Sequence, residues 1–215
     1  AGMGREIAEA VPEAMAVFTE GSEAAGLDLP RLCFESPLED LVHTEVQQPA
    51  LVATSLAVLA ALRKRGLEPD YVVGHSVGEF TALAATMSLT PFESIALVRE
   101  RGLAMAEAAR ISNGSMAAIL GLEDELVEQI CSDIEGVWPA NYNCPGQIVI
   151  SGESAAVDRA MELVKLAGGK AKKLNVSGAF HSPLMEYAVE GLSTALDLAH
   201  FADARFPIYA NVNGQ

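Results

Sequence analysis

The sequence predicts an α/β fold made of a layered core and a small inserted domain. Two observations support this prediction. Between residues 50 and 85, a long apolar helix, a short strand, a glycine-containing turn and a second helix follow one another, which is the order of elements in a layered α/β domain. Between residues 113 and 177 the pattern changes to β-α-β-β-α-β, the order of a ferredoxin-like unit.

The first part of the core starts with the apolar run 50–62. Two arginines and a lysine follow it, and then Gly66, which is typical of the C-terminal end of a buried helix. The run is shorter than the roughly 18 residues that a membrane span needs, so we expect no membrane association. Residues 71–73 predict a short strand of the kind that a parallel sheet buries on both faces.

The rest of the core contains two capped helices and a strand. Thr90 and Glu93 form a capping box with a proline between them, which predicts the start of a helix. Ser182 is a cap for a helix over 184–198. The apolar segment 207–212 predicts a closing strand.

The inserted domain is predicted from turns and alternating apolar residues. Its expected strands are 116–120, 137–141, 147–151 and 170–176, and its expected helices are 123–134 and 154–166. The domain division that follows is a catalytic core over 1–112 and 178–215, interrupted by a small subdomain over 113–177.

Composition excludes several classes of protein. Half of the 215 residues are hydrophobic, which excludes an intrinsically disordered chain. With 29 acidic and 14 basic residues, the net charge of −15 argues against nucleic-acid binding. Three widely spaced cysteines argue against a disulfide framework and against a zinc site, so no metal is expected. Since no targeting segment is visible, we expect a cytoplasmic protein.

The most informative motif is Gly74-His75-Ser76-Val77-Gly78, a G-x-S-x-G pattern. A serine that attacks a carbonyl carbon projects from a sharp strand-to-helix turn, and glycines two positions on either side leave room for the neighbouring strand and helix. The same turn directs the Val77 N–H toward the place where an oxyanion would form. The alternative interpretation is a glycine-containing turn with an inactive serine.

A serine hydroxyl is a weak nucleophile and needs a base, most often histidine. His75 adjoins the serine, but neighbours at such a turn point in different directions. His43 and His200 lie at ordinary surface positions. His181 is on a loop just before a helix, from which a side chain can reach across a cleft. From the residues alone, a catalytic base and a surface histidine are equally good interpretations of His181.

Arg101 follows in the helix after this turn, close to Arg99 and Glu100. Two arginines near helical glutamates usually form a solvated face, so position alone does not favour a functional role.

Six segments occur in an order that resembles the malonyl-CoA:acyl carrier protein transacylase family, which includes the acyltransferase domains of fatty acid and polyketide synthases. They are Gln48-Pro49-Ala50-Leu51, Gly74-His75-Ser76-Val77-Gly78-Glu79, Arg101-Gly102, Asn141-Tyr142-Asn143-Cys144-Pro145-Gly146-Gln147, Ala179-Phe180-His181-Ser182-Pro183-Leu184-Met185 and Asn211-Val212. The resemblance spans nearly the whole chain. It implies an α/β-hydrolase-like parallel-sheet core with an inserted ferredoxin-like small subdomain.

The resemblance also implies roles for individual residues. Ser76 would be the acyl-accepting nucleophile and His181 its base. Arg101 would bind the free carboxylate of the malonyl group, because a guanidinium matches a carboxylate with two parallel hydrogen bonds. The Val77 N–H would be one oxyanion donor, and Gln48 would line the site.

The implied reaction is a ping-pong transfer of malonyl from malonyl-CoA to the phosphopantetheine thiol of acyl carrier protein, with no bound cofactor. Phe180 would disfavour a 2-methyl substituent on the acyl group, since malonyl-selective members of the family carry phenylalanine there. Carrier proteins are acidic, so docking would need a local basic patch. The candidates are Lys170, Lys172, Lys173 and Arg159.

Two departures from the family pattern concern the ends. Family members open with a strand and a loop whose glutamine contributes to the oxyanion hole, and they continue past Val212 to a glutamine that orients the histidine. We therefore expect a trimmed fragment. The loss of one oxyanion donor typically costs about 10²–10³ in rate, so reduced activity is expected.

Two other functions stay open at this point. A serine hydrolase or thioesterase would use the same Ser76 and His181 with an acidic residue between them in the sequence. The acidic candidates, which are expected on helix surfaces of the inserted domain, are Asp124, Asp133 and Asp158. An uncharged ester gives Arg101 no purpose, which argues against this alternative. The non-enzymatic alternative is an impaired fragment that acts as a binding scaffold.

Overall fold

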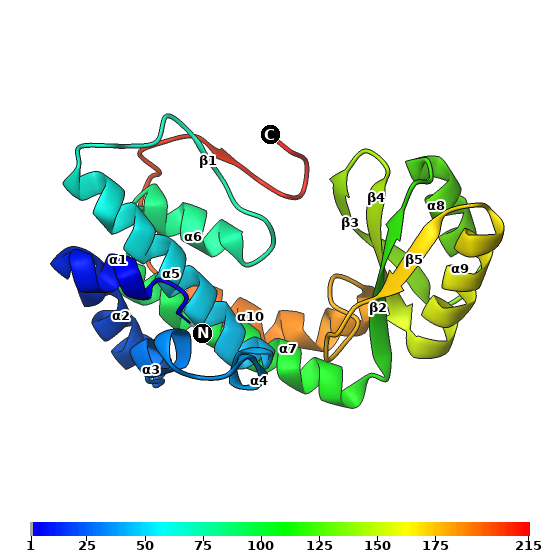
Figure 1. Cartoon of the computed structure of the whole chain (residues 1–215), viewed down its shortest axis with the longest axis horizontal. Coiled ribbons are helices and arrows are strands. Elements are labelled where there is room, and N and C mark those ends of the chain that lie inside the picture. Colours follow the sequence, from blue (N-terminus) through cyan, green and yellow to red (C-terminus); the bar gives the residue numbers. More distant parts are fainter. Residues whose placement is uncertain (1) are drawn as a thin grey trace. The chain divides into compact units, whose positions relative to one another are not determined.

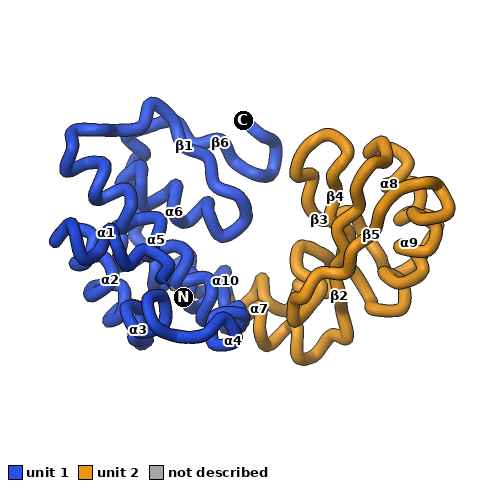
Figure 2. Tube along the Cα trace, viewed as in Figure 1, with its two compact units in different colours: residues 1–103, 192–215 blue, residues 104–191 orange. Residues whose placement is uncertain are grey.

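The computed structural model describes residues 2–215 and shows two compact units (Figures 1 and 2). The first unit comprises the chain up to Leu103 together with Leu192–Gln215, and the second comprises Ala104–Gly191. The predicted small subdomain, 113–177, lies inside the second unit and encloses its whole sheet. As domain limits, 1–112, 178–215 and 113–177 stay a prediction.

Helices make up most of the first unit, and α5 (Thr44–Lys64) is its central helix. The helices packed around α5 are α1 (Arg5–Ala10), α2 (Pro12–Ala25), α3 (Leu29–Phe34), α4 (Leu38–Leu41) and α6 (Gly78–Ala85). The core of this unit includes Ala53 and Val52 of α5 together with Phe18 of α2, all of them fully buried. Apolar burial of this kind is the main source of stability for a helical layer.

The end of α5 confirms the prediction for the apolar run. Gly66 has a positive φ of 76°, and the Leu67 N–H donates to the carbonyl of Leu62 at 3.1 Å, which closes the helix. By length and composition α5 could cross a membrane. This is weak evidence for a span, because the core helix of a soluble protein passes the same test, and one face of α5 is buried among the other helices.

A two-stranded parallel sheet completes the first unit. Strand β1 (Val72–Val73) pairs with β6 (Ile208–Tyr209), with Val73 opposite Tyr209. A parallel sheet was predicted, although not the pairing of these two segments. The expectation of a strand buried on both faces is wrong, because Val73 is 67% exposed and Tyr71, just before the strand, is 63% exposed. The reason is that no layer of the described residues 2–215 covers this side of the two strands.

Two long helices, α7 (Pro91–Ile111) and α10 (Glu186–Leu198), each extend through both units. The predicted capping box of α7 is confirmed, since the Glu93 N–H donates to Thr90 Oγ1 at 3.1 Å and the Thr90 N–H donates to Glu93 Oε2 at 2.8 Å. A 3₁₀ turn over Pro183–Met185 precedes α10, and the Ser182 side chain caps it as expected.

The second unit contains the predicted β-α-β-β-α-β order. Its elements are β2 (Gly114–Leu120), α8 (Asp124–Ser132), β3 (Val137–Cys144), β4 (Gln147–Glu153), α9 (Ser154–Leu166) and β5 (Lys170–Lys173). The strands form an antiparallel sheet in the order β3-β4-β2-β5. Ile119 and Ile150 on one face of this sheet pack against Val127 of α8 and Val157 of α9, which makes a separate apolar core.

Candidate active site

The predicted motif forms a sharp turn between β1 and α6. Among residues 2–215, three residues other than glycine have a positive φ, namely Ser76 (54°), Met87 (64°) and His181 (58°). Such backbone conformations cost free energy and concentrate at functional sites. The Gly78 N–H donates to the carbonyl of His75 at 2.9 Å, so the chain enters α6 directly after the serine.

The two glycines of the motif differ in what they allow. A Cβ atom on Gly74 would lie 2.0 Å from the backbone carbonyl of Gly78, so no side chain fits there. A Cβ atom on Gly78 would contact nothing within 4 Å. The expectation that both glycines leave room is therefore right for Gly74 and wrong for Gly78.

The serine hydroxyl lies beside Arg101 of α7. The Nη2 atom of Arg101 is 3.2 Å from Ser76 Oγ, and its Nη1 atom donates to Gln48 Oε1 at 2.5 Å. Gln48 is buried on α5, where its amide nitrogen donates to Thr44 Oγ1 at 2.8 Å. Arg101 is therefore held by an oriented amide and not by the glutamates of its own helix.

Close packing of α7 against α5 brings Arg101 to this position. A Cβ atom on Gly102 would lie 2.6 Å from the Cα atom of Glu45 and 2.9 Å from the carbonyl oxygen of Thr44. Arg99 also donates to the Glu45 carbonyl at 2.6 Å. The absence of a side chain at Gly102 lets the two helices touch, and this explains the Arg101-Gly102 pair in the sequence.

The electrostatic environment of Arg101 is that of a partly desolvated cation. Burial lowers the pKa of the Arg101 guanidinium, and the nearby carboxylate of Glu79 acts in the opposite direction. Arginine stays protonated at neutral pH even so. A cation that has lost part of its water next to a hydroxyl is a good binding group for an anionic substrate.

His181 and Phe180 belong to the second unit, whereas Ser76, Arg101 and Gln48 belong to the first. His181 is exposed. Its loop is fixed by close contacts within the second unit, because a Cβ atom on Gly178 would lie 2.5 Å from Ala109 of α7. The loop therefore presents His181 in a defined, left-handed backbone conformation.

Phe180 is half-buried in a small apolar cluster. The ring packs with Met105 and Ala108 of α7, with Met185 of the 3₁₀ turn and with Ala188 of α10. Part of its surface is therefore used for packing, which fixes the residue next to His181.

The predicted basic patch is divided between two faces of β5. Lys173 forms an ion pair with Asp158 of α9 at 2.7 Å, on the side of the sheet that the helices cover. Side chains alternate along a strand, and Ala171 packs into the apolar core. Lys170 and Lys172 therefore point to the other face of the strand.

The acidic residues between Ser76 and His181 have local roles in the second unit. Asp158 pairs with Lys173, and Asp133 accepts a hydrogen bond from Gln129 at 2.8 Å. Asp124 lies in the first turn of α8. The carboxylates of Asp158 and Asp133 are therefore used in contacts within the second unit.

One residue at the turn was not assigned a role from the sequence. Asn211 follows β6, and its side chain contacts the backbone on both sides of His75, at Gly74 and at Ser76. The sequence contained a signal for this position. The segment of β1 leads into the motif, and the segment of β6 was expected to be another strand of the same core. The carboxyl ends of parallel strands meet at one edge of a sheet, so the residues just after β6 belong beside the motif.

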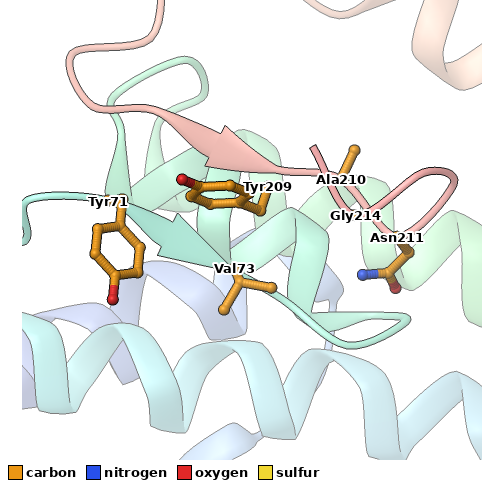
Figure 3. Close-up of a pocket in the computed structure, with 6 residues that line it drawn as sticks. All are labelled: Tyr71, Val73, Tyr209, Ala210, Asn211 and Gly214. Atoms are coloured by element: carbon orange, nitrogen blue, oxygen red, sulfur yellow. The ribbon is translucent and has the colours of Figure 1, made fainter. Parts of the chain in front are cut away.

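Figure 3 shows Asn211 at the border of a hollow of about 540 Å³ on the exposed side of the parallel strands. The hollow is lined by Tyr71, Val73, Tyr209, Ala210, Asn211 and Gly214. The rings of Tyr71 and Tyr209 make an edge-to-face contact with centroids 5.6 Å apart. None of the residues predicted as catalytic or substrate-binding lines this hollow.

Comparison with known proteins identifies the class to which this arrangement belongs. The chain matches the acyl transferase domain family over residues 1–215. A malonyl CoA-acyl carrier protein transacylase from Bacillus subtilis (strain 168) is 45% identical over 217 residues, which cover 99% of this chain and 68% of the relative.

Solved structures agree with this match. The crystal structure of malonyl CoA-acyl carrier protein transacylase from Clostridium perfringens has a TM-score of 0.95 at 39% identity, covering 100% of this chain and 69% of that chain. A type II PKS acyl-carrier protein in complex with its malonyl-transacylase also matches, with a TM-score of 0.95 at 36% identity over 100% of this chain and 71% of that chain.

The chain therefore belongs to the malonyl-CoA:acyl carrier protein transacylase family of acyltransferases. The comparisons confirm both the resemblance and the predicted fold class, an α/β-hydrolase-like core with an inserted ferredoxin-like subdomain.

Proposed function

We propose that this chain transfers a malonyl group from malonyl-CoA to the phosphopantetheine thiol of an acyl carrier protein through an acyl-enzyme on Ser76. One observation carries the proposal: the Arg101 guanidinium lies 3.2 Å from the hydroxyl of a serine that is held in a left-handed conformation at a strand-to-helix turn. A malonyl thioester carries a reactive carbonyl and a free carboxylate separated by one carbon, so these two groups suit a nucleophile and a cation side by side.

In the first half-reaction, Ser76 Oγ attacks the thioester carbonyl carbon while His181 takes the hydroxyl proton. The Val77 N–H, at the start of α6, donates to the oxyanion of the tetrahedral intermediate. The C–S bond then breaks, and His181 returns the proton to the sulfur of CoA. The products are free CoA and a malonyl ester on Ser76.

In the second half-reaction, the phosphopantetheine thiol gives its proton to His181, and the sulfur attacks the ester carbonyl carbon. The C–O bond to Ser76 breaks, and the serine oxygen recovers the proton. The first half-reaction replaces sulfur by oxygen on the acyl carbon, and the second replaces oxygen by sulfur. Neither involves oxidation or reduction, so the proposed chemistry needs no resident cofactor or metal.

Arg101 and Gln48 are proposed to select the substrate. The Arg101 guanidinium would form a two-bond contact with the malonyl carboxylate, and Gln48 orients it through the 2.5 Å hydrogen bond to Nη1. Phe180, fixed by its apolar cluster, would crowd a 2-methyl group, so methylmalonyl-CoA is expected to be a poor donor. We propose that the reaction takes place in the cytoplasm, with CoA and the carrier protein as partners and without nucleic acid or membrane.

The proposal is tested by acyl labelling. Incubation with radiolabelled malonyl-CoA is expected to give a stable label that is absent from Ser76→Ala and that moves to carrier protein when it is added. A label that leaves as free malonate at the same rate with or without carrier protein would support a hydrolase. No label above that of Ser76→Ala would support a binding scaffold and refute the proposal.

Substrate choice tests the role of Arg101. We expect Arg101→Ala to lower the preference for malonyl-CoA over acetyl-CoA by about 10²-fold, because a charge-assisted pair contributes roughly 1.5–3 kcal/mol. The measurement is the ratio of second-order acylation rate constants for the two donors. Arg110→Ala is the matched control, since Arg110 is on the same helix and pairs with Glu107 at an exposed position. A ratio unchanged from the parent chain would remove Arg101 from the binding site.

A further inference from the structure

We infer that Asn211 is a positioning residue for the nucleophile: its side-chain amide holds the backbone of the turn in the shape that presents Ser76. This inference rests on the proposed function, because it assigns Asn211 to the same serine. Asn211 is 135 residues from Ser76 in the sequence, yet all of its contacts with the turn lie within the first unit.

The amide group of Asn211 makes two hydrogen bonds with the turn. Its oxygen Oδ1 accepts from the backbone N–H of Ser76 at 2.7 Å. Its nitrogen Nδ2 donates to the backbone carbonyl of Gly74. One planar group thus connects the two residues that flank His75 and keeps them at a fixed separation.

Asn211 is itself fixed from the other side. Its backbone N–H donates to Glu79 Oε1 at 2.8 Å, and Glu79 is in the first turn of α6. The loop after Asn211 is closed by the Gly214 N–H, which donates to the carbonyl of Ala210 at 2.9 Å. The amide is therefore held between α6 and the end of β6.

The turn needs such a support for two reasons. Ser76 has a left-handed backbone conformation, which persists only where the surrounding structure imposes it. The strand that leads into the turn is two residues long, and its last residue, Val73, is 67% exposed, so no long backbone pairing imposes the conformation. An asparagine side chain supplies both the acceptor for Ser76 and the donor for Gly74, and no apolar or carboxylate side chain of the same size supplies both.

Acylation kinetics test this role. In single-turnover labelling at saturating malonyl-CoA, Asn211→Leu is expected to acylate about 10²-fold more slowly, because small misplacements of a reacting group cost this much. The half-saturating malonyl-CoA concentration is expected to stay within about twofold, since no contact of the substrate is removed. Asn211→Asp keeps the acceptor for the Ser76 N–H, so its acylation rate is expected to lie between those of Asn211→Leu and the parent chain.

Asn213→Leu is the matched control. Asn213 lies in the same loop, where its side chain accepts from the Gln215 N–H at 3.0 Å, a contact within the loop itself. It is expected to acylate at the rate of the parent chain. Equal rates for Asn211→Leu and the parent, in a chain whose labelling depends on Ser76, would overturn the inference and leave the proposed function intact.

A second measurement does not depend on activity. The amide hydrogen of Ser76 is expected to exchange slowly in the parent chain and in Asn213→Leu, and at least about tenfold faster in Asn211→Leu, because its hydrogen bond to Asn211 Oδ1 is lost. Slow exchange in both variants would overturn the inference even if the chain were not labelled at all. Thermal unfolding of each variant shows whether faster exchange comes from the turn or from global unfolding.

Discussion

The two sheets of this protein are stabilised in different ways. The antiparallel sheet of the second unit has four strands, and its covered face contributes Ile119, Ile148 and Ile150, each 1% exposed, to an apolar core. The parallel sheet of the first unit has two strands of two residues each, in which Val72 and Ile208 are half-buried and Val73 and Tyr209 are exposed. Ser76, the candidate nucleophile, follows a strand of this parallel sheet.

The difference shows what a reactive turn requires. Apolar burial is non-directional, so it stabilises a layer without deciding where one hydroxyl points. Steric exclusion at Gly74 and the directional hydrogen bonds of Asn211 and Arg101 define the position of Ser76. The predictions below therefore separate effects on stability from effects on rate.

The largest effect is expected for Gly74→Ala. The added Cβ atom would overlap the Gly78 carbonyl at 2.0 Å, so the turn must open, and we expect Ser76 acylation to slow by at least about 10²-fold. Gly78→Ala, whose Cβ atom meets nothing within 4 Å, is the control and should retain most of the rate. Similar acylation rates for both variants would show that the turn is not defined by steric exclusion.

The second effect concerns stability in the antiparallel sheet. Ile150→Ala removes buried methyl groups from the apolar core and is expected to lower the free energy of unfolding by about 2–5 kcal/mol. Ile150→Val should cost about 0.5–1.5 kcal/mol. Denaturant unfolding measures both. If Ile150→Ala slows acylation of the remaining folded protein as much as Gly74→Ala does, stability and acylation rate do not depend on separate regions.

The smallest effect concerns a polar contact that only caps a helix. The side-chain hydroxyl and the backbone N–H of Thr90 donate to the Glu93 carboxylate and lower its pKa below 4.5. The Glu93 carboxylate therefore contributes fully to the free energy of unfolding at neutral pH, and this contribution is lost as pH falls through its lowered pKa. Thr90→Ala should cost about 0.5–2 kcal/mol at pH 7.

Unfolding measured at several pH values checks the direction of this effect. The stability difference between the parent chain and Glu93→Gln should shrink as pH falls below 4.5 and through the lowered pKa of Glu93. A difference that grows with acid would contradict the assignment.

Much of the fold could be predicted because its signals are local. The capping box of Thr90 and Glu93, the glycine after α5 and the alternating strands of the second unit each depend on residues close together in sequence. The exposure of β1 could not be predicted, because Tyr71 and Val73 have the composition of a buried strand and only the neighbouring layers decide what covers it.

The candidate site was predictable to a similar extent. The motif around Ser76 predicted a strained turn, and the structure shows a left-handed serine there. The roles of Arg101 and Gln48 came from the resemblance, and their contact depends on helix packing at Gly102, which no local pattern contains. The part played by Asn211 depends on the pairing of β6 with β1, a contact between segments more than 130 residues apart.

The sequence by itself determined the end of α5, the start of α7, the order of elements in the second unit, which serine occupies the strand-to-helix turn and to which family the chain belongs. These features depend on short-range chemistry and on motif order. Tertiary structure alone decided that Arg101 contacts Ser76 and Gln48, that Asn211 holds the turn and that Lys173 pairs with Asp158. The physical reason is that hydrogen bonds and steric contacts act over a few ångströms, and only the folded chain brings distant residues within that range.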